Sequence, residues 1–369
     1  MADAIKNISI YKLSIPLKKP FIISLGPITH AENIIVKITT DKGLQGFGEC
    51  SPFMTINGEN QDTAFIVGQL LGKKLLGKNI NEAQENLDAM NEVIYGNSSI
   101  KSAFDIAMLD ASAKEAGIPL YKYLGGKKNK KIITDYTVSL GSAEQMAADA
   151  LLIKQNGFEI IKVKLGTSFK DDVERIKAIR DAVGKKIDLR IDANQGWDVQ
   201  TAIKTLSSLY KYNIQYCEEP IARWDHVNLK KVKNKSRIPV MADESCCDHH
   251  DAARLISEKS CDMFNLKLGK SSGITNAMKI IKLAEKAGMH MQVGGFMESK
   301  IGMTANAHLA LTSKNIRYYD FDTPLMFADD PVSGGIEYKE NGLVEVPETP
   351  GLGASIPDER LNQLECVEL

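Results

Sequence analysis

The sequence predicts an α/β protein in which a TIM-type barrel follows an α+β domain. Three observations support this fold class: eight short apolar runs alternate with helix-like segments, the alternation repeats about every 25 residues, and the residues ahead of it follow a different pattern. Strands that alternate with helices form parallel βαβ units, and eight such units close into a barrel. A doubly wound open sheet is the rival fold, but no GxGxxG turn opens any of the units.

The first 126 residues predict the α+β domain. Residues 1–52 hold strand-like stretches with a DKG turn between them, and residues 60–126 are helix-like. The clearest helix covers residues 102–117, because its apolar side chains recur every three or four positions and Gly117 marks its end. We therefore expect antiparallel strands followed by helices in this part of the chain.

Eight apolar runs predict the barrel strands, at residues 134–140, 159–165, 186–194, 214–220, 238–245, 262–269, 289–296 and 316–322. Amphipathic segments such as 168–184 separate them. After residue 325 only short strand-like pieces remain. We therefore divide the chain into the N-terminal part of a capping domain (1–126), a catalytic barrel (127–325) and a C-terminal segment that returns to the capping domain (326–369).

Composition excludes several classes of partner. The chain has 46 Lys and Arg against 47 Asp and Glu, which gives no sign of a nucleic-acid or anionic-membrane partner. No run reaches the ~18 apolar residues of a spanning helix, and the N-terminus lacks a signal-peptide pattern. The six cysteines are scattered without paired zinc spacing, which favours reduced thiols and a cytoplasmic location.

Ionisable side chains stand at the carboxyl ends of the predicted strands, where the chemistry of such barrels gathers. They are Lys162, Lys164, Asp192, Glu218, Glu219, Asp243, Glu244, Lys267, Asp320 and Asp322. One such group stands on each of five successive strands. These groups are separated by 28, 26, 25 and 24 residues, from Lys164 through Asp192, Glu218 and Asp243 to Lys267. A single group could be a salt bridge at the barrel rim, but five consecutive strands in phase argue for a shared function.

Asp192, Glu218 and Asp243 fall on neighbouring strands and predict a metal site. Three adjacent carboxylates need a positive charge in order to coexist. Hard oxygen ligands with no His or Cys among them favour Mg²⁺ over zinc. The ion would keep open positions for water or for substrate oxygens.

Lys164 and Lys267 fall four strands apart in a circle of eight, so we expect them to face each other across the barrel. Two amines on opposite faces of a metal-held carboxylate suggest a two-base reaction, in which one lysine removes an α-proton and the other returns a proton from the opposite face. Lys162 is a like charge beside Lys164, which would favour the neutral amine that a base needs. Schiff-base chemistry is the competing use of such a lysine, but it needs no carboxylate triplet.

Several motifs resemble those of the enolase superfamily, in its muconate-lactonizing subgroup. They are KVK (162–164), RIDANQGW (190–197), CEEP (217–220), ADES (242–245), LKLGKSSGI (266–274) and GGFMES (294–299), preceded by residues 103–126. The resemblance covers nearly the whole chain. It implies an α+β capping domain over a modified TIM barrel, (β/α)₇β, with Mg²⁺ on the three carboxylates and Lys164 and Lys267 as the acid/base pair. This superfamily is a known case of lysine or histidine bases with Mg²⁺ stabilising an ene-diolate. The resemblance also implies that Glu244 is a partner of Lys267.

Within the subgroup, Asp320 and Asp322 point to the reaction. Two carboxylates at the far rim suit a substrate ammonium group, and both this DxD pattern and the INGEN stretch (56–60) are similar to those of dipeptide epimerases. The resemblance implies an isomerase that inverts the C-terminal residue of an L-Ala-L-Xaa dipeptide, with further substrate contacts at Lys162, Thr137, Gly295 and Met297. N-acylamino acid racemisation and o-succinylbenzoate synthesis remain alternatives. A catalytically inactive ligand-binding barrel is the third, although binding alone needs no pair of bases.

The capping loops predict the second residue of that dipeptide. Ala-Glu epimerases often place an Arg in the first loop to hold the glutamate side chain, and residues 21–30 contain no Arg or Lys. His30 is the only basic candidate among otherwise apolar loop side chains, namely Phe21, Ile23, Leu25, Ile28, Phe53 and Met54. We therefore expect an apolar or uncharged second residue.

Two further expectations concern metals and assembly. The CCDHH stretch (246–250) lacks the usual spacing of zinc ligands and favours a helix start with Asp248 as its N-cap. We expect the protein to form a homo-oligomer.

Overall fold

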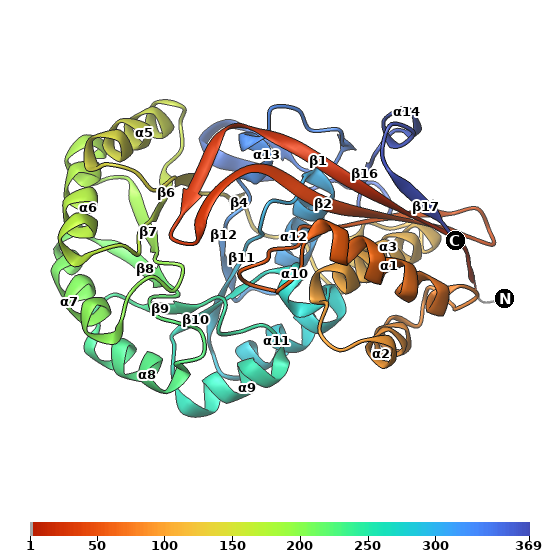
Figure 1. Ribbon diagram of the computed structural model, residues 1–369, viewed down its shortest axis with the longest axis horizontal. Helices are drawn as coiled ribbons and strands as arrows, with labels where there is room; N and C mark the ends of the chain where they lie inside the picture. Colours follow the sequence, from red (N-terminus) through yellow and green to blue (C-terminus); the bar gives the residue numbers. More distant parts are fainter. Residues whose placement is uncertain (1–2) are drawn as a thin grey trace.

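The computed structural model describes residues 3–369 and begins with a four-stranded antiparallel sheet (Figure 1). The strand order is β17-β1-β2-β3. The strands are β1 (Ile5–Ile23), β2 (Gly26–Thr40), β3 (Gln45–Cys50) and β17 (Cys366–Glu368). The β1–β2 hairpin is much longer than its partners, so its tip extends beyond the sheet and over the barrel (Figure 1).

Four helices follow this sheet: α1 (Gln61–Leu75), α2 (Ala83–Val93), α3 (Ser98–Glu115) and α4 (Leu120–Tyr123). Helix α3 starts four residues before the predicted helix, and it is buried on almost every side. Two glycines of β3 allow this close packing: a Cβ atom at Gly48 would lie 1.9 Å from the carbonyl oxygen of Ala103, and one at Gly46 would lie 2.0 Å from that of Ala107. Helix α3 therefore forms the rigid centre of the cap.

The eight predicted runs all form strands of one parallel sheet. In sheet order these are β5 (Tyr136–Val138), β6 (Ile160–Lys164), β7 (Asp188–Asp192), β8 (Ile214–Glu218), β9 (Val240–Ala242), β10 (Met263–Leu266), β11 (His290–Val293) and β12 (Ile316–Tyr319). The main-chain N–H of Asp135 donates to the carbonyl oxygen of Tyr319 at 3.3 Å, which brings the first and last strands together. The predicted fold class, a modified TIM barrel with an α+β cap, is confirmed.

Helices surround this sheet (Figure 1). They are α5 (Ala143–Gln155), α6 (Phe169–Val183), α7 (Val199–Leu209), α8 (His226–Lys235), α9 (His249–Glu258), α10 (Leu268–Ser271), α11 (Ile274–Lys286) and α12 (Lys300–Ala310), with a 3-10 turn η1 (Tyr210–Tyr212) after α7. The side chain of Asp248 accepts hydrogen bonds from the main chain of His250 and Asp251, so the predicted N-cap of α9 is confirmed. No zinc-like group of His and Cys ligands forms within residues 3–369.

The C-terminal segment crosses both parts of the molecule. After α13 (Thr323–Met326), short strands pair with each other and with β4 (Ile132–Ile133), and β17 joins the outer edge of β1. The remaining elements are β13 (Ser333–Gly334), β14 (Glu337–Tyr338), η2 (Glu340–Gly342), β15 (Leu343–Glu345), β16 (Ala354–Ser355) and α14 (Asp358–Leu361). The division at residues 126 and 325 stays a prediction.

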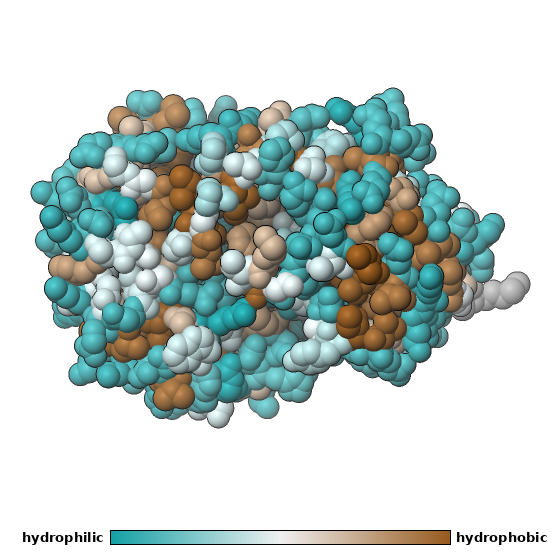
Figure 2. Space-filling view, viewed as in Figure 1, coloured by the Kyte–Doolittle hydropathy of each residue, from teal (hydrophilic) through white to brown (hydrophobic). Residues whose placement is uncertain are grey.

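The surface is mainly hydrophilic, with apolar side chains gathered over α1 (Figure 2). Ile66 is 61% exposed and Leu70 is 48% exposed, and they lie one helical turn apart. Among residues 3–369, no helix combines the length and apolar character that a membrane crossing requires. The homo-oligomer stays a prediction.

Candidate active site

The predicted ionisable side chains converge inside the barrel mouth. Residues Lys164, Asp192 and Glu218 are laterally paired at the ends of β6, β7 and β8, which places their side chains at one height. Lys162 lies within β6, Glu219 follows β8, and the others follow β9, β10 and β12. All are buried, namely Lys162, Lys164, Asp192, Glu218, Glu219, Asp243, Glu244, Lys267, Asp320 and Asp322. Because buried charges must be compensated, each needs a partner of opposite sign.

The three predicted metal ligands form what we call the carboxylate trio. Each lies against a lysine ammonium group: Asp192 Oδ2 is 2.6 Å from Lys164 Nζ, Glu218 Oε2 is 2.8 Å from Lys162 Nζ, and Asp243 Oδ2 is 2.7 Å from Lys267 Nζ. Within residues 3–369, one group of three possible metal-ligating side chains has its ligand atoms within 4.8 Å of one another, and it consists of Asp135, Asp320 and Asp322. The trio does not form such a group. In this arrangement the ammonium groups are the cations that separate the three carboxylates.

Lys162 bridges two parts of the mouth. Its Nζ lies 2.8 Å from Glu218, 3.4 Å from Asp192 and 2.8 Å from Asp320. Burial acts to lower the pKa of Lys162, but the carboxylates, Asp320 foremost, outweigh burial and hold the pKa well above its usual range. Lys162 therefore keeps its charge beside Lys164, and the effect of that charge on Lys164 as a base stays a prediction.

Asp243 is fixed from several sides. Its carboxylate lies between Lys267 and Lys270, with Lys270 Nζ 2.5 Å from Oδ1. Burial acts to raise the pKa of Asp243, but the two lysines outweigh it and lower the pKa far below the usual range. Glu219 accepts hydrogen bonds from the main-chain N–H groups of Asp243 (2.6 Å) and Ser245 (3.2 Å), which fixes the backbone that carries this ligand.

Glu244 has a different partner from the one that the family resemblance implies. Its carboxylate accepts a hydrogen bond from Asn194 Nδ2 at 3.3 Å, and Oε2 has no hydrogen-bond partner. Within residues 3–369, Lys267 pairs with Asp243 and forms no ion pair with Glu244. Burial, followed by the nearby Asp243, raises the pKa of Glu244 well above its usual range, so this carboxyl group favours its protonated form.

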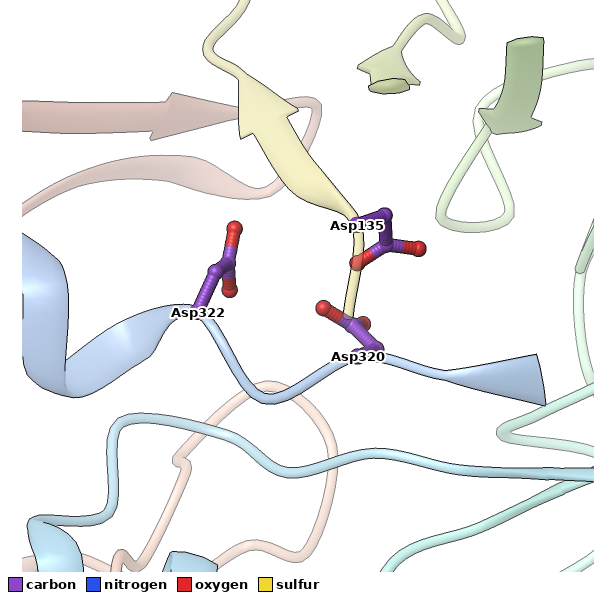
Figure 3. Close-up of side chains that lie close together, drawn as sticks. All are labelled: Asp135, Asp320 and Asp322. Atoms are coloured by element: carbon purple, nitrogen blue, oxygen red, sulfur yellow. The ribbon is translucent and has the colours of Figure 1, made fainter. Parts of the chain in front are cut away.

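A second acidic cluster lies where β12 meets β5 (Figure 3). Carboxylate oxygens of Asp135, Asp320 and Asp322 lie within 4.8 Å of one another. Asp322 Oδ2 accepts a hydrogen bond from the main-chain N–H of Thr137 at 2.7 Å. Burial, then the charge of Asp320, raises the pKa of Asp322 to about 7, whereas Lys162 overcomes the effect of burial and lowers that of Asp320 to about 2. We call these three residues the aspartate cluster.

The sequence analysis did not single out Asp135, Arg190 or Lys270. Asp135 Oδ2 lies 2.7 Å from Arg190 Nη1, and the other oxygen, Oδ1, has no hydrogen-bond partner. Asp135 precedes Thr137 by two residues, so the two-residue period of a strand could have placed it on the same face. Lys270 follows Lys267 by three residues, which is the spacing of neighbours on a helix surface.

The other predicted contacts lie beside the hairpin tip. A Cβ atom at Gly295 would lie 2.4 Å from Glu298 Oε2, so a larger residue at this position would displace that carboxylate. The carbonyl oxygen of Met297 accepts a hydrogen bond from Asn33 Nδ2 at 2.8 Å, which ties this segment to the cap. Met297 also lines a cavity of about 550 Å³ between the hairpin tip and the loop after β3, together with Leu25, Ile28, His30, Phe53 and Met54.

Comparisons with known proteins agree with this geometry. Residues 6–125 match the family model of the mandelate racemase / muconate lactonizing enzyme N-terminal domain, and residues 145–360 match that of the enolase C-terminal domain-like family. The chain is 60% identical to a D-Ala-D/L-Ala epimerase of Cytophaga hutchinsonii, over 98% of this chain and 99% of that protein. It is 38% identical to a hydrophobic dipeptide epimerase of Enterococcus faecalis, over 95% and 99% of the two chains.

A solved structure is similar over the whole length. The crystal structure of a dipeptide epimerase from Cytophaga hutchinsonii, complexed with Mg and the dipeptide D-Ala-L-Val, superimposes with a TM-score of 0.98 at 59% identity and covers 100% of both chains. The family predicted from the sequence motifs is thereby confirmed. With the N-terminal and barrel domains both matched, the chain belongs to the enolase superfamily, in its mandelate racemase and muconate lactonizing enzyme branch.

Proposed function

We propose that the protein is a Mg²⁺-dependent dipeptide epimerase that inverts the α-carbon of the C-terminal residue by two-base proton transfer. One observation supports this proposal: Lys162 lies between the carboxylate trio and the aspartate cluster, which suits an ammonium group. It contacts Glu218 of the trio and Asp320 of the cluster. A dipeptide has an ammonium group at one end and a carboxylate at the other. The two subsites thus match the two ends of such a substrate.

The donor set fits Mg²⁺. Carboxylate oxygens without His or Cys are the ligands of a hard divalent cation. Both Asp243 oxygens face ammonium groups, yet neither accepts a hydrogen bond of good geometry, so this buried carboxylate remains able to bind an ion. Asp192, Glu218 and Asp243 would hold the metal. When bound, it supplies positive charge that stabilises the negative charge developing on the substrate carboxylate.

The buried charges of the mouth also favour a bound cation. Eight carboxylates are buried there, namely Asp135, Asp192, Glu218, Glu219, Asp243, Glu244, Asp320 and Asp322. Five cationic side chains accompany them, namely Lys162, Lys164, Arg190, Lys267 and Lys270. When every group is ionised, the negative charges therefore outnumber the positive charges by three. A divalent cation would supply two of the missing positive charges, and the protonated form that Glu244 favours would remove the need for the third.

Lys164 and Lys267 perform the proton transfers. The lysine on one face takes the α-proton as the C–H bond breaks, and the electron pair moves into the carboxylate to give an ene-diolate. The ammonium group of the other lysine then donates a proton to the opposite face and becomes the neutral amine. Strands β6 and β10 are separated by three strands in the sheet, which supports placing the two amines on opposite sides of the substrate.

The cavity beside the hairpin tip supports an apolar second residue. Its lining includes Leu25, Ile28, Phe53 and Met54, with His30 as its basic side chain. The sequence predicts L-Ala as the first residue, whereas the relative at 60% identity is named for D-Ala-D/L-Ala. Alanine at the first position is common to both, and a small apolar residue at the second suits the cavity.

Deuterium exchange on a dipeptide panel tests the proposal. The panel contains L-Ala and D-Ala at the first position and Ala, Val, Leu, Tyr, Glu and Lys at the second, with N-acetyl-amino acids and o-succinylbenzoate precursors as controls. In D₂O with Mg²⁺, we expect α-deuterium in the second residue of apolar dipeptides. A preference for Glu would overturn the apolar specificity. Exchange confined to N-acyl substrates would overturn the dipeptide assignment.

A further inference from the structure

The chain after β10 carries one of the two proposed bases on a short irregular stretch. We call residues 267–275 the Lys267 segment. It contains Lys267, the single-turn helix α10 and the first residues of α11. The carbonyl oxygen of Lys267 accepts hydrogen bonds from the N–H groups of Lys270 (3.0 Å) and Ser271 (3.2 Å), so the position of the base depends on how this stretch is held.

The start of α11 has no N-cap side chain of its own. Its N-cap residue is Gly273, with φ 108°, and no side-chain hydrogen bond caps the helix from that position. The missing acceptor comes from the cap domain: the carboxylate of Asp105, on α3, accepts from the N–H of Thr275 at 3.0 Å and from its hydroxyl at 2.5 Å. A Cβ atom at position 273 would lie 2.4 Å from Asp105 Oδ2, so glycine is needed for this carboxylate to approach.

The carboxylate of Asp105 suits this task electrostatically. It is fully buried, and the N-terminus of a helix favours a negative charge. Burial raises the pKa of Asp105 to about 6, and the hydrogen bonds from Thr275 limit the rise. The group is therefore mainly ionised at neutral pH, as a helix-capping anion should be.

A second contact from the cap holds the middle of the Lys267 segment. Asn57 Nδ2 donates to the carbonyl oxygen of Gly269 at 2.9 Å and also contacts the hydroxyls of Ser98 and Ser99 at the start of α3. Gly269 packs beneath the ring of Phe296, and that ring lies 4.8 Å from Lys267 Nζ. The cap thus holds α10 at Gly269 and the start of α11 at Thr275.

We propose that Asp105 is a positioning residue for Lys267: by capping α11 from the cap domain, it fixes the segment that carries this base while leaving Lys164 unaffected. The inference rests on the proposed function, because it assigns the two lysines to separate proton transfers. Lys164 forms no hydrogen bond or ion pair with α3; its neighbours are Asp192, Asn194 and, at 5.9 Å, the ring of Phe21. Loosening the Lys267 segment should therefore slow the proton transfer that Lys267 performs and leave that of Lys164 unchanged.

The test measures each lysine separately. Starting from pure L or pure D second residue, the initial rate of α-deuterium uptake into the uninverted epimer in D₂O reports the lysine that removes the proton from that epimer, because the same lysine returns the deuteron to the same face. Lys164→Arg and Lys267→Arg calibrate which epimer reports which base. With Asp105→Asn, we expect the Lys267-dependent exchange to fall by roughly 10- to 100-fold, the loss typical of a misplaced catalytic group. The Lys164-dependent exchange should change by less than about twofold.

Asp110→Asn is the matched control. Asp110 is also a fully buried carboxylate of α3, but it accepts from the N–H groups of Phe47 (2.8 Å) and Leu352 (2.7 Å) and contacts nothing in the Lys267 segment. We expect this variant to lose thermal stability and to change both exchange rates equally. If Asp105→Asn does not fold, Thr275→Val removes the hydroxyl donor from the barrel side and should give the same one-sided loss.

The outcomes separate the two proposals. Equal loss from both epimers, or no loss, with Asp105→Asn or Thr275→Val would overturn the positioning role while leaving the epimerase assignment intact. Absence of α-proton exchange by the wild-type enzyme on every dipeptide of the panel would instead overturn the proposed function.

Discussion

The two sides of the barrel mouth are held by different parts of the cap. On the β10 side, polar side chains of the cap domain bind the chain directly: the fully buried Asp105 binds Thr275, and Asn57 binds Gly269. Nearby, Glu49 of β3 accepts hydrogen bonds from the main chain of Ser299 (2.9 Å) and Gly302 (2.8 Å) at the start of α12. We call this the anchored side.

On the β6 side, the cap reaches the barrel through the β1–β2 hairpin. Ser24, in the tip of that hairpin, donates from its hydroxyl to the carbonyl oxygens of Asn194 (3.1 Å) and Ala193 (3.3 Å), so a single hydroxyl group makes both contacts. A turn held by one hydroxyl group opens more readily than a segment held by a fully buried carboxylate on a buried helix. The anchored side therefore holds the segment that carries Lys267, and we expect the substrate to enter on the hairpin side.

The largest effects should come from the bases themselves. Lys164→Ala or Lys267→Ala should lower epimerisation by about 10³-fold or more, since each removes a group that must gain or lose a proton in every turnover. Chiral chromatography of the products measures the loss. Wild-type turnover by either variant would show that the two sides do not carry one base each.

The next largest effect concerns acid stability on the anchored side. His308 of α12 accepts a hydrogen bond at Nδ1 from the N–H of Tyr121 (3.1 Å), while Nε2 lies 3.1 Å from the carbonyl oxygen of Leu352. Burial lowers the pKa of His308 to about 4 from its ordinary 6.5. Below pH 6.5 the unfolded chain binds a proton that the folded protein excludes, so stability falls as the pH drops from 6.5 towards 4.

That difference in pKa corresponds to about 3 kcal/mol of unfolding free energy at pH 4. Urea unfolding of wild type and His308→Gln across this range measures it. We expect the wild-type curve to fall more steeply by about that amount. Parallel curves for the two proteins would contradict the assignment.

A smaller effect should follow from the aspartate cluster. Asp322→Asn removes one negative charge facing the substrate ammonium group, and a lost charge-assisted hydrogen bond of about 1.5 kcal/mol should raise KM for a free dipeptide about tenfold. The N-propionyl analogue, which lacks the ammonium group, serves as the control. Its inhibition constant should stay within about twofold of the wild-type value; an equal rise for both ligands would place the ammonium elsewhere.

The smallest effect tests the hairpin side. Ser24→Ala removes the two hydroxyl contacts of the tip and should raise KM about two- to fivefold with kcat nearly unchanged, since the bond is partly exposed. Limited proteolysis should cut the hairpin faster in the variant. Unchanged KM together with unchanged proteolysis would show that this contact does not hold the hairpin side closed.

Local sequence signals were enough for the strands and for most of the mouth. The repeating spacing from Lys164 to Lys267 located the ionisable groups because each parallel strand ends at the same edge of the barrel. The family resemblance, by contrast, implied a Glu244–Lys267 pair, and the structure pairs Lys267 with Asp243 instead. Which carboxylate faces which ammonium group depends on side-chain geometry that strand spacing does not encode.

Long-range contacts were beyond such signals. Asp105 and Thr275 are 170 residues apart, and nothing in either local pattern links them. Helix α3 was predicted from its apolar period, but it is buried on nearly every side, so its polar residues could be assigned no partner from one amphipathic face. The capping role became visible only when the cap and the barrel were seen packed together.

The pairing of β17 with β1 sets an order for biosynthesis. Strand β1 is made first, yet its outer neighbour comes from residues 366–368, so at about 5–20 residues per second the ribosome needs roughly 20 to 70 seconds to supply it. During that interval β1 presents an open edge, which is a template for pairing with another nascent chain. The cap sheet can be completed only after residues 366–368, and with them all the barrel segments, have emerged from the ribosome.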